Sequence, residues 1–248
     1  FLILFKKEIV SKGKFGNKTF LYKLNIKNIR WGGRGYFLYR NKQESILEFG
    51  ERFLKKGDVV LDCGANQGIF TLSFRCKVGK EGKLFCVEPF SQCVKAIKKN
   101  LILNNYRNIK IYPNVISDSA RNYKIDYSNG ITEASIVKKG GTKQKKVKSI
   151  TIDSIVKLNN LKKLDFIKLD VEGAEHLALI GGLKSIKKFN PIIYLEYSNE
   201  SMFNKIKKFS LNINYKMYYI NNIGKLIRTK KFSRFKNKDR QLLLSKNK

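Results

Sequence analysis

Short apolar runs alternate with amphipathic stretches from about residue 58 onward. The apolar runs with the length of buried strands are Val59–Cys63, Lys83–Val87, Ile109–Ile116, Leu164–Asp170 and Ile192–Glu196. Stretches with apolar residues at helical spacing lie between them, at Ile69–Lys77, from about Ser91, at Thr151–Leu161 and at Ala174–Phe189. This alternation predicts an α/β fold with a mostly parallel sheet, because parallel neighbours need a crossover connection between them.

The remaining segments complete the predicted architecture. Tyr215–Ile220 and Gln241–Leu244 are strand candidates for an antiparallel C-terminal edge, so we expect about seven strands with helices on both faces. The polar, glycine-containing segment 119–149 predicts a hairpin excursion that covers the site,. Before it, we expect short strands around Trp31–Gly33 and a helix over Lys42–Leu54.

One folding unit is expected. A hydrophobic content of 42% is sufficient for the core of a two-sided sheet,, and no Pro-rich or Ser-rich linker divides the chain. We therefore expect residues 1–50 to form an N-terminal extension packed on the core and residues 51–248 to form the main domain.

The charge is strongly basic, with 52 Lys and Arg against 19 Asp and Glu and a net charge of +33. Such a charge favours an anionic partner such as nucleic acid. The lysines are spread along the chain, however, and a solvated lysine-rich surface explains them equally well. The basic stretch Lys225–Arg240, which contains Phe232 and Phe235, is where an RNA contact would be sought, although a lysine-rich edge strand that resists aggregation is preferred.

The cysteines indicate a reducing compartment. Cys63, Cys76, Cys86 and Cys93 form no C-x-x-C pair and the chain has one histidine, His176, so a zinc site is not expected. Apolar neighbours suit buried thiols, and we expect a cytoplasmic protein. The first apolar run, Phe1–Phe5, is far shorter than the roughly 20 residues of a membrane span.

A glycine-containing turn follows the first strand of the main domain. Asp62, Gly64, Asn66 and Gly68 lie where the strand passes into a helix, and a ligand can approach the backbone there,. Glu88 ends the next strand, at the spacing of about 20 residues at which an acidic side chain accepts the hydroxyls of a ribose. Together they predict an adenosine site, whereas a turn without ligand is the simpler alternative.

The composition of this turn favours S-adenosylmethionine over a dinucleotide. A pyrophosphate site has the pattern G-x-G-x-x-G, but Asn66 stands at the middle position here,. The carboxylate of Asp62 would repel phosphates, whereas it suits the ammonium and sulfonium charges of S-adenosylmethionine.

Asp170 and Glu172 follow the fourth strand, at the edge where ligands of open α/β sheets bind,. A carboxylate there can orient or deprotonate an acceptor hydroxyl, and the alternative is that both residues cap the next helix. His176, one turn later, is more often structural than catalytic. Asp170 and Glu196 could share Mg²⁺, but no third oxygen ligand is evident, so no metal is expected.

These motifs resemble the FkbM family of methyltransferases over roughly residues 40–200. The matching segments are Gly57–Gly68, Val87–Pro89, Ser117–Asp118, Thr151–Ser154, Ile167–Glu175 and the Glu196 strand. The resemblance implies a Rossmann-like class I methyltransferase fold, with Asp62, Gly64, Asn66 and Gly68 at the methionine half, Glu88 at the ribose and Asp118 near the adenine. For Asp118, a turn or helix cap is also a common role of a Ser-Asp pair.

The resemblance implies an enzyme that methylates a hydroxyl oxygen on a glycan or small metabolite. The segment at Asp170 lacks the Asn/Asp-Pro-Pro-aromatic run of many amine-methylating enzymes, which also favours oxygen. Methylation of an RNA 2′-hydroxyl stays open because of the charge. A non-catalytic nucleotide-binding module is the other alternative, although Asp62, Glu88 and Asp170 are all present.

Overall fold

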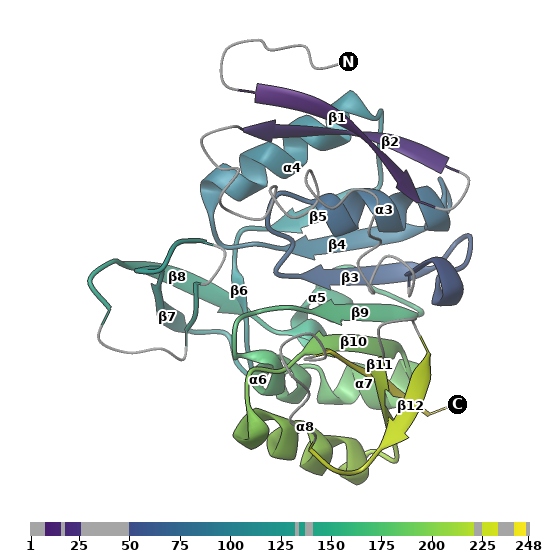
Figure 1. Cartoon of the computed structure of the whole chain (residues 1–248), viewed down its shortest axis with the longest axis vertical. Coiled ribbons are helices and arrows are strands. Elements are labelled where there is room, and N and C mark those ends of the chain that lie inside the picture. Colours follow the sequence, from purple (N-terminus) through teal and green to yellow (C-terminus); the bar gives the residue numbers. More distant parts are fainter. Residues whose placement is uncertain are drawn as a thin grey trace.

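The computed structural model describes residues 8–15, 18–25, 50–131, 134–136, 141–220, 225–232 and 241–246. Its centre is an eight-stranded sheet in the order β12-β11-β13-β10-β9-β3-β4-β5 (Figure 1). The strands are β3 (Val59–Cys63), β4 (Lys83–Val87), β5 (Ile109–Tyr112), β9 (Phe166–Leu169), β10 (Ile192–Glu196), β11 (Lys216–Ile220), β12 (Leu226–Thr229) and β13 (Gln241–Ser245).

The directions of these strands confirm the predicted fold class. Strands β5, β4, β3, β9 and β10 are parallel, and β13 lies antiparallel between β10 and β11. The expected C-terminal edge therefore exists, and β12, which the sequence pattern did not indicate, extends it as an antiparallel partner of β11.

Helices cover both faces of the sheet. They are α3 (Ile69–Val78), α4 (Ser91–Leu103), α5 (Ile152–Leu158), α6 (Glu175–Ile180), α7 (Leu183–Phe189) and α8 (Glu200–Asn212). Side chains alternate along each strand, so Val60 and Leu84 pack with Phe74 of α3. Leu61 and Phe85 face the opposite way, into a core that also contains Ile155 and Phe203. The core is thus divided by the sheet into two layers.

The expected strand Ile109–Ile116 is interrupted. It forms β5 and a separate short strand, β6 (Val115–Ile116), with Pro113 between them. Proline lacks the N–H that a continuous ladder needs. β6 pairs instead with β8 (Gln144–Ile150), which pairs antiparallel with β7 (Asn122–Asp126). The excursion after residue 119 is therefore built on a small three-stranded sheet, seen at the left of Figure 1.

The predicted helix Ala174–Phe189 is wrong as one element, because it divides into α6 and α7 at Gly181–Gly182. Asp153 of α5 explains the division. Its N–H donates to the Gly181 carbonyl at 3.0 Å, and its carboxylate accepts the N–H groups of Lys184 and Ser185. A tertiary cap therefore starts α7, and Gly181 fits because a Cβ there would lie 2.1 Å from the Ser117 carbonyl oxygen.

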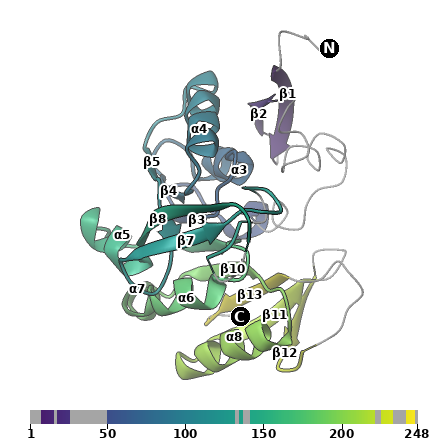
Figure 2. The same cartoon turned by 90° about the vertical axis from the view of Figure 1, so that its left-hand side faces the viewer.

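An N-terminal hairpin lies beside α3 and α4 (Figure 2). Its strands β1 (Glu8–Phe15) and β2 (Lys18–Asn25) are antiparallel. The Asn104 side-chain amide accepts the Leu21 N–H at 2.7 Å and donates to the Leu21 carbonyl at 2.6 Å. Phe20 and Tyr22 of the hairpin are buried. The strands expected around Trp31 and most of the helix expected over Lys42–Leu54 lie outside the described residues. The division at residue 50 stays a prediction.

Candidate active site

A cavity of about 430 Å³ opens at the carboxyl ends of β3, β4, β9 and β10. The turn after β3, the end of β4 and the loop after β9 provide its polar wall. Its apolar wall includes residues of the 119–149 excursion, namely Ile125, Ile131, Ala134 and Ile136. Since ligands of open α/β sheets bind beyond the carboxyl ends of strands, this is the candidate site.

The turn after β3 is held against both neighbouring strands. The N–H groups of Gly64 and Ala65 donate to the Val87 carbonyl at 2.9 and 3.2 Å. Gly64 has a φ of 75°, and a Cβ on it would lie 1.8 Å from the carbonyl oxygen of Asp170. Only glycine brings the turn this close to the loop after β9, so two walls of the cavity meet at this residue.

Glu88 lies at the end of β4 and is buried, with 5% of its surface exposed. Its Oε2 accepts the Asn66 N–H and its Oε1 accepts the Phe90 N–H, both at 2.9 Å. Burial raises the pKa of Glu88 to about 7, although these hydrogen bonds oppose the rise,. Gly64, Asn66 and Glu88 thus border one cavity, as the sequence predicted.

Lys168 is a charged residue of the cavity wall that the sequence reasoning missed. It belongs to β9 and is 1% exposed, yet it lines the cavity. Its Nζ lies 3.0 Å from the Gly64 carbonyl oxygen, 3.3 Å from Asp62 Oδ1 and 3.4 Å from Asp170 Oδ2. Burial acts to lower its pKa, but the two carboxylates outweigh burial and raise it. A permanent cation therefore joins the ends of β3 and β9.

Three carboxyl groups line the side of the cavity beyond β9 and β10: Asp170, Glu172 and Glu196. Burial, and then the charges of Asp170, Glu172 and Glu175, raise the pKa of Glu196 to about 8. Glu172 has a left-handed φ of 53°, which costs about 1–2 kcal/mol in a residue with a side chain. Backbone strain of this kind is concentrated at functional sites.

Glu175 shapes the loop that carries Glu172. Its Oε1 accepts the N–H groups of Val171 and Gly173 at 3.0 and 3.3 Å. Burial raises its pKa to about 7. His176 is not among the cavity-lining residues, and burial lowers its pKa.

Three residues predicted for the cofactor are not among those that line the cavity. Asp62 lies beneath it, where it accepts the Thr71 hydroxyl at 2.6 Å and pairs with Lys168. Gly68 precedes α3 and packs against Ile97.

Asp118 is the third, and it lies outside the cavity. Its Oδ1 accepts the hydroxyls of Ser117 and Tyr123 at 3.0 Å and ion-pairs with Arg121 at 3.2 Å. The residues of this region that do line the cavity are Asn114, Val115 and Ile116.

Within the part of the chain that the structure describes, no group of three or more His, Cys, Asp or Glu residues is arranged to hold a metal ion. In that same part no helix is long and apolar enough to cross a membrane.

Comparisons with known proteins identify a family for this chain. The methyltransferase FkbM domain model matches residues 62–217. Among curated proteins, the 2-O-methyltransferase NoeI of Sinorhizobium fredii is 28% identical over 170 residues, covering 60% of this chain and 68% of the relative.

Solved structures share the fold. The methyltransferase FkbM of Methylobacillus flagellatus is 14% identical with a TM-score of 0.53, and the match covers 89% of this chain and 59% of that one. Trm5b of Pyrococcus abyssi is 12% identical with a TM-score of 0.50, over 96% of this chain and 55% of that one. At these identities the likeness concerns the fold alone.

Proposed function

This chain belongs to the FkbM family of S-adenosylmethionine-dependent methyltransferases, and we propose that it methylates a hydroxyl oxygen on a glycan or small metabolite. The observation that carries the proposal is the convergence of Gly64, Glu88 and Asp170 on one cavity. The relative from Sinorhizobium fredii, named a 2-O-methyltransferase, supports oxygen as the methyl acceptor.

The residues of the cavity fit S-adenosylmethionine. Glu88 presents a buried carboxylate to the cavity without an ion-pair partner among the described residues, and such a group can accept both hydroxyls of a ribose. Gly64 and Asn66 would hold the methionine half, while Asp62 and Gly68 support the turn from behind. S-adenosylmethionine, when bound, supplies a methyl group on a cationic sulfonium.

A contact between Asp118 and the adenine ring is a prediction from the family resemblance. Asp118 does not line the cavity, so the geometry does not support this contact. Asn114, Val115 and Ile116 are better placed, because they line the cavity beyond the end of β5. An apolar wall with one amide side chain suits a flat, hydrogen-bonding ring.

The acceptor hydroxyl is proposed to bind beside Asp170 and Glu172. Carboxylates there can orient the hydroxyl and receive its proton. The excursion that contributes Ile125, Ile131 and Ile136 would shape the acceptor side.

A labelled-methyl transfer screen over glycans, small hydroxylated metabolites and RNA tests the proposal. We expect label on a hydroxylated glycan or metabolite, and transfer reduced by about 10²-fold in Asp170→Asn. Label found on RNA alone would replace the proposed acceptor class with the nucleic-acid one.

We propose a cytoplasmic location because all four cysteines are free and buried,. Fractionation of cells that express the chain with a tag checks this, and recovery from the secreted fraction would contradict it.

A further inference from the structure

Asp170 lies between a basic and an acidic side chain. On one side is the buried ammonium of Lys168, 3.4 Å from Asp170 Oδ2. On the other side lies the carboxyl group of Glu196, at the end of the neighbouring strand β10; both carboxyl groups line the cavity, and the proximity of Asp170 raises the pKa of Glu196. Two carboxyl groups can share a hydrogen bond only when one of them carries a proton. Asp170 and Glu196, which lie side by side at the wall of the cavity, are therefore placed to share one proton.

The surroundings decide which member holds the proton. The cation of Lys168 stabilises negative charge on Asp170,. Among the described residues, the charges that act most strongly on Glu196 are acidic: Asp170 directly after β9, Glu172 in the same loop and Glu175 at the start of α6. From β13 its register partner is the neutral Gln241. The proton of the pair accordingly lies on Glu196, with a pKa of about 8.

We propose that Glu196 is a further catalytic residue, the proton acceptor of the methyl transfer, and that Lys168 is a positioning residue that holds the Asp170 carboxylate beside it. The inference rests on the proposed function. The acceptor oxygen forms a bond to the methyl carbon as the methyl–sulfur bond breaks, sulfur keeps that electron pair, and the hydroxyl proton passes to the ionised Glu196 carboxylate. Asp170 orients the hydroxyl.

The surroundings of Glu196 suit a proton acceptor better than those of Glu88. A general base works best when it titrates near the working pH, and Glu196 does so because burial and three carboxylates oppose its ionisation. Glu88 has a similarly raised pKa, but both its carboxylate oxygens accept backbone N–H groups at the other end of the cavity. Glu196 and Asp170 stand together at the ends of β10 and β9.

A pH titration of the carboxyl groups by NMR tests the pair directly. Protein labelled with ¹³C in the Glu side-chain carboxyls and saturated with S-adenosylhomocysteine is titrated from pH 4 to 10. We expect one Glu196 signal that titrates near pH 8, is absent in Glu196→Gln and moves to lower pH in Asp170→Asn. Glu81→Gln changes an exposed glutamate in the turn before β4 and should leave the signal unchanged.

Kinetics test the role of the pair. With an acceptor from the screen, the wild-type rate should rise with pH up to about 8, and Glu196→Gln should lose about 10²-fold in kcat together with that rise, while its affinity for S-adenosylmethionine stays the same. Lys168→Arg should retain more activity than Lys168→Met, because it keeps the cation.

Either of two results would overturn the inference: a Glu196 signal that titrates near pH 4.5, or a Glu196→Gln enzyme with the wild-type rate and pH profile. Failure of the proposed function has a different signature, namely wild-type protein that binds S-adenosylmethionine but methylates no hydroxyl compound.

Discussion

At the scale of single residues, the site depends on carboxyl groups that the fold removes from water. Glu88 is the clearest case, because two backbone N–H groups stabilise its charge and no residue of the described segments forms an ion pair with it. A charge held in this way is available to a ligand, since hydroxyl groups can replace or add to the backbone donors. Its raised pKa then makes ligand binding depend on pH.

The affinity for S-adenosylmethionine should fall as the pH is lowered from 8 to 6. Glu88 has a pKa of about 7, so it is protonated below that pH and loses part of its capacity to accept hydrogen bonds from the ribose. Glu88→Gln should bind about 10²-fold more weakly at pH 8 and show little dependence on pH. Calorimetry across this range measures both effects, with Glu81→Gln as the matched control; equal affinity of wild type and Glu88→Gln contradicts the ribose contact.

Replacing Lys168 should destabilise the protein strongly. Lys168→Met leaves the buried Asp62 and the half-buried Asp170 without their cation, and breaking a buried ion pair by removing one partner costs about 3–5 kcal/mol. The matched control is Lys163→Met, because Lys163 also approaches two carboxylates but its side chain is 50% exposed. Exposed pairs contribute about 0–1 kcal/mol. Urea unfolding measures both free energies, and similar losses for the two variants would show that Lys168 carries no special charge role.

At the scale of elements, the cavity exists because the ends of β3, β4 and β9 are bonded to one another. Gly64 N–H reaches the Val87 carbonyl, and the Asp170 N–H reaches the Cys63 carbonyl at 3.2 Å. The turn after β3 and the loop after β9 therefore form one unit, and a change in either shifts both the cofactor wall and the carboxylate wall.

A methyl group at Gly64 should separate these two walls. Gly64→Ala combines the cost of a left-handed φ, about 1–2 kcal/mol, with a clash against the Asp170 carbonyl oxygen. Gly57→Ala has a similar φ of 83° but no atom within 4 Å of the added carbon. Its loss of stability therefore measures the cost of the left-handed φ alone. Thermal unfolding and calorimetry should show a larger loss of stability for Gly64→Ala and loss of S-adenosylmethionine binding in that variant alone. Equal behaviour of the two variants would mean that the close approach is unimportant.

The sequence was sufficient to predict some elements but not others, for identifiable reasons. The parallel strands and the helices between them were predictable because their apolar residues have the period of buried strands and of one-sided helices. The division between α6 and α7 was not, since the cap comes from Asp153, about 30 residues away in sequence. Helix α8 (Glu200–Asn212) was not predicted, although its N-cap Asn199, whose side chain accepts the Met202 N–H, is a readable signal,.

The same contrast holds for the site. Gly64, Asn66, Glu88, Asp170 and Glu172 all line the cavity, and they were predictable because they lie in turns or loops at the carboxyl ends of parallel strands, where ligands bind. Lys168 was missed, since a lysine inside an apolar run gives no indication of its partners, which lie on β3 and in the following turn. The position of the Asp118 side chain is fixed by hydrogen bonds from the Ser117 and Tyr123 hydroxyls. The spacing of these residues in the sequence does not indicate those bonds.

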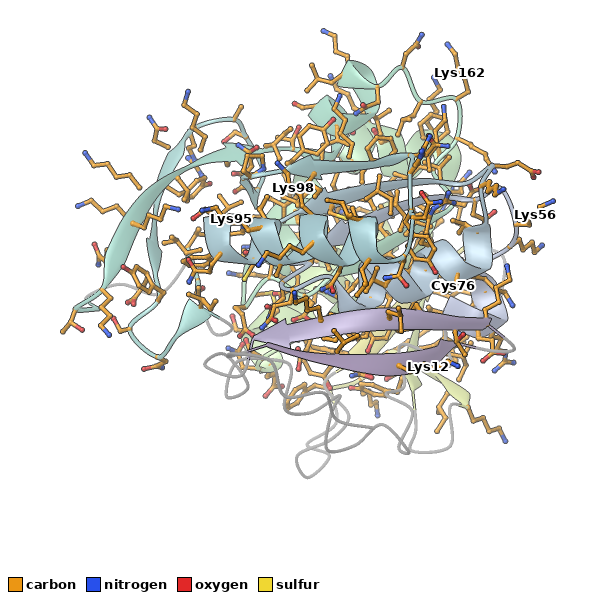
Figure 3. All side chains as sticks on the ribbon, turned by 90° about the horizontal axis from the view of Figure 1, so that it is seen from above. Lys12, Lys56, Cys76, Lys95, Lys98 and Lys162 are labelled. Atoms are coloured by element: carbon orange, nitrogen blue, oxygen red, sulfur yellow. The ribbon has the colours of Figure 1, made fainter. Side chains whose placement is uncertain are left out.

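At the scale of the whole molecule, the positive charge is dispersed. Figure 3 shows Lys56, Lys162 and the two α4 residues Lys95 and Lys98 on different parts of the molecule, and all four are exposed. A net charge of +33 spread in this way promotes general attraction to polyanions. We therefore expect retention of the protein on heparin that is lost at moderate salt, without methyl transfer to RNA. Methylated RNA in the labelled screen would show that the charge serves recognition.

A crystal structure of the protein with S-adenosylhomocysteine tests the central claim most directly. The account predicts that both ribose hydroxyls lie within hydrogen-bond distance of the Glu88 carboxylate, that the amino-acid half contacts the turn from Gly64 to Gln67, and that the sulfur atom faces Asp170 and Glu196. A ligand bound away from Glu88, or one whose sulfur points away from these two carboxyl groups, would contradict it.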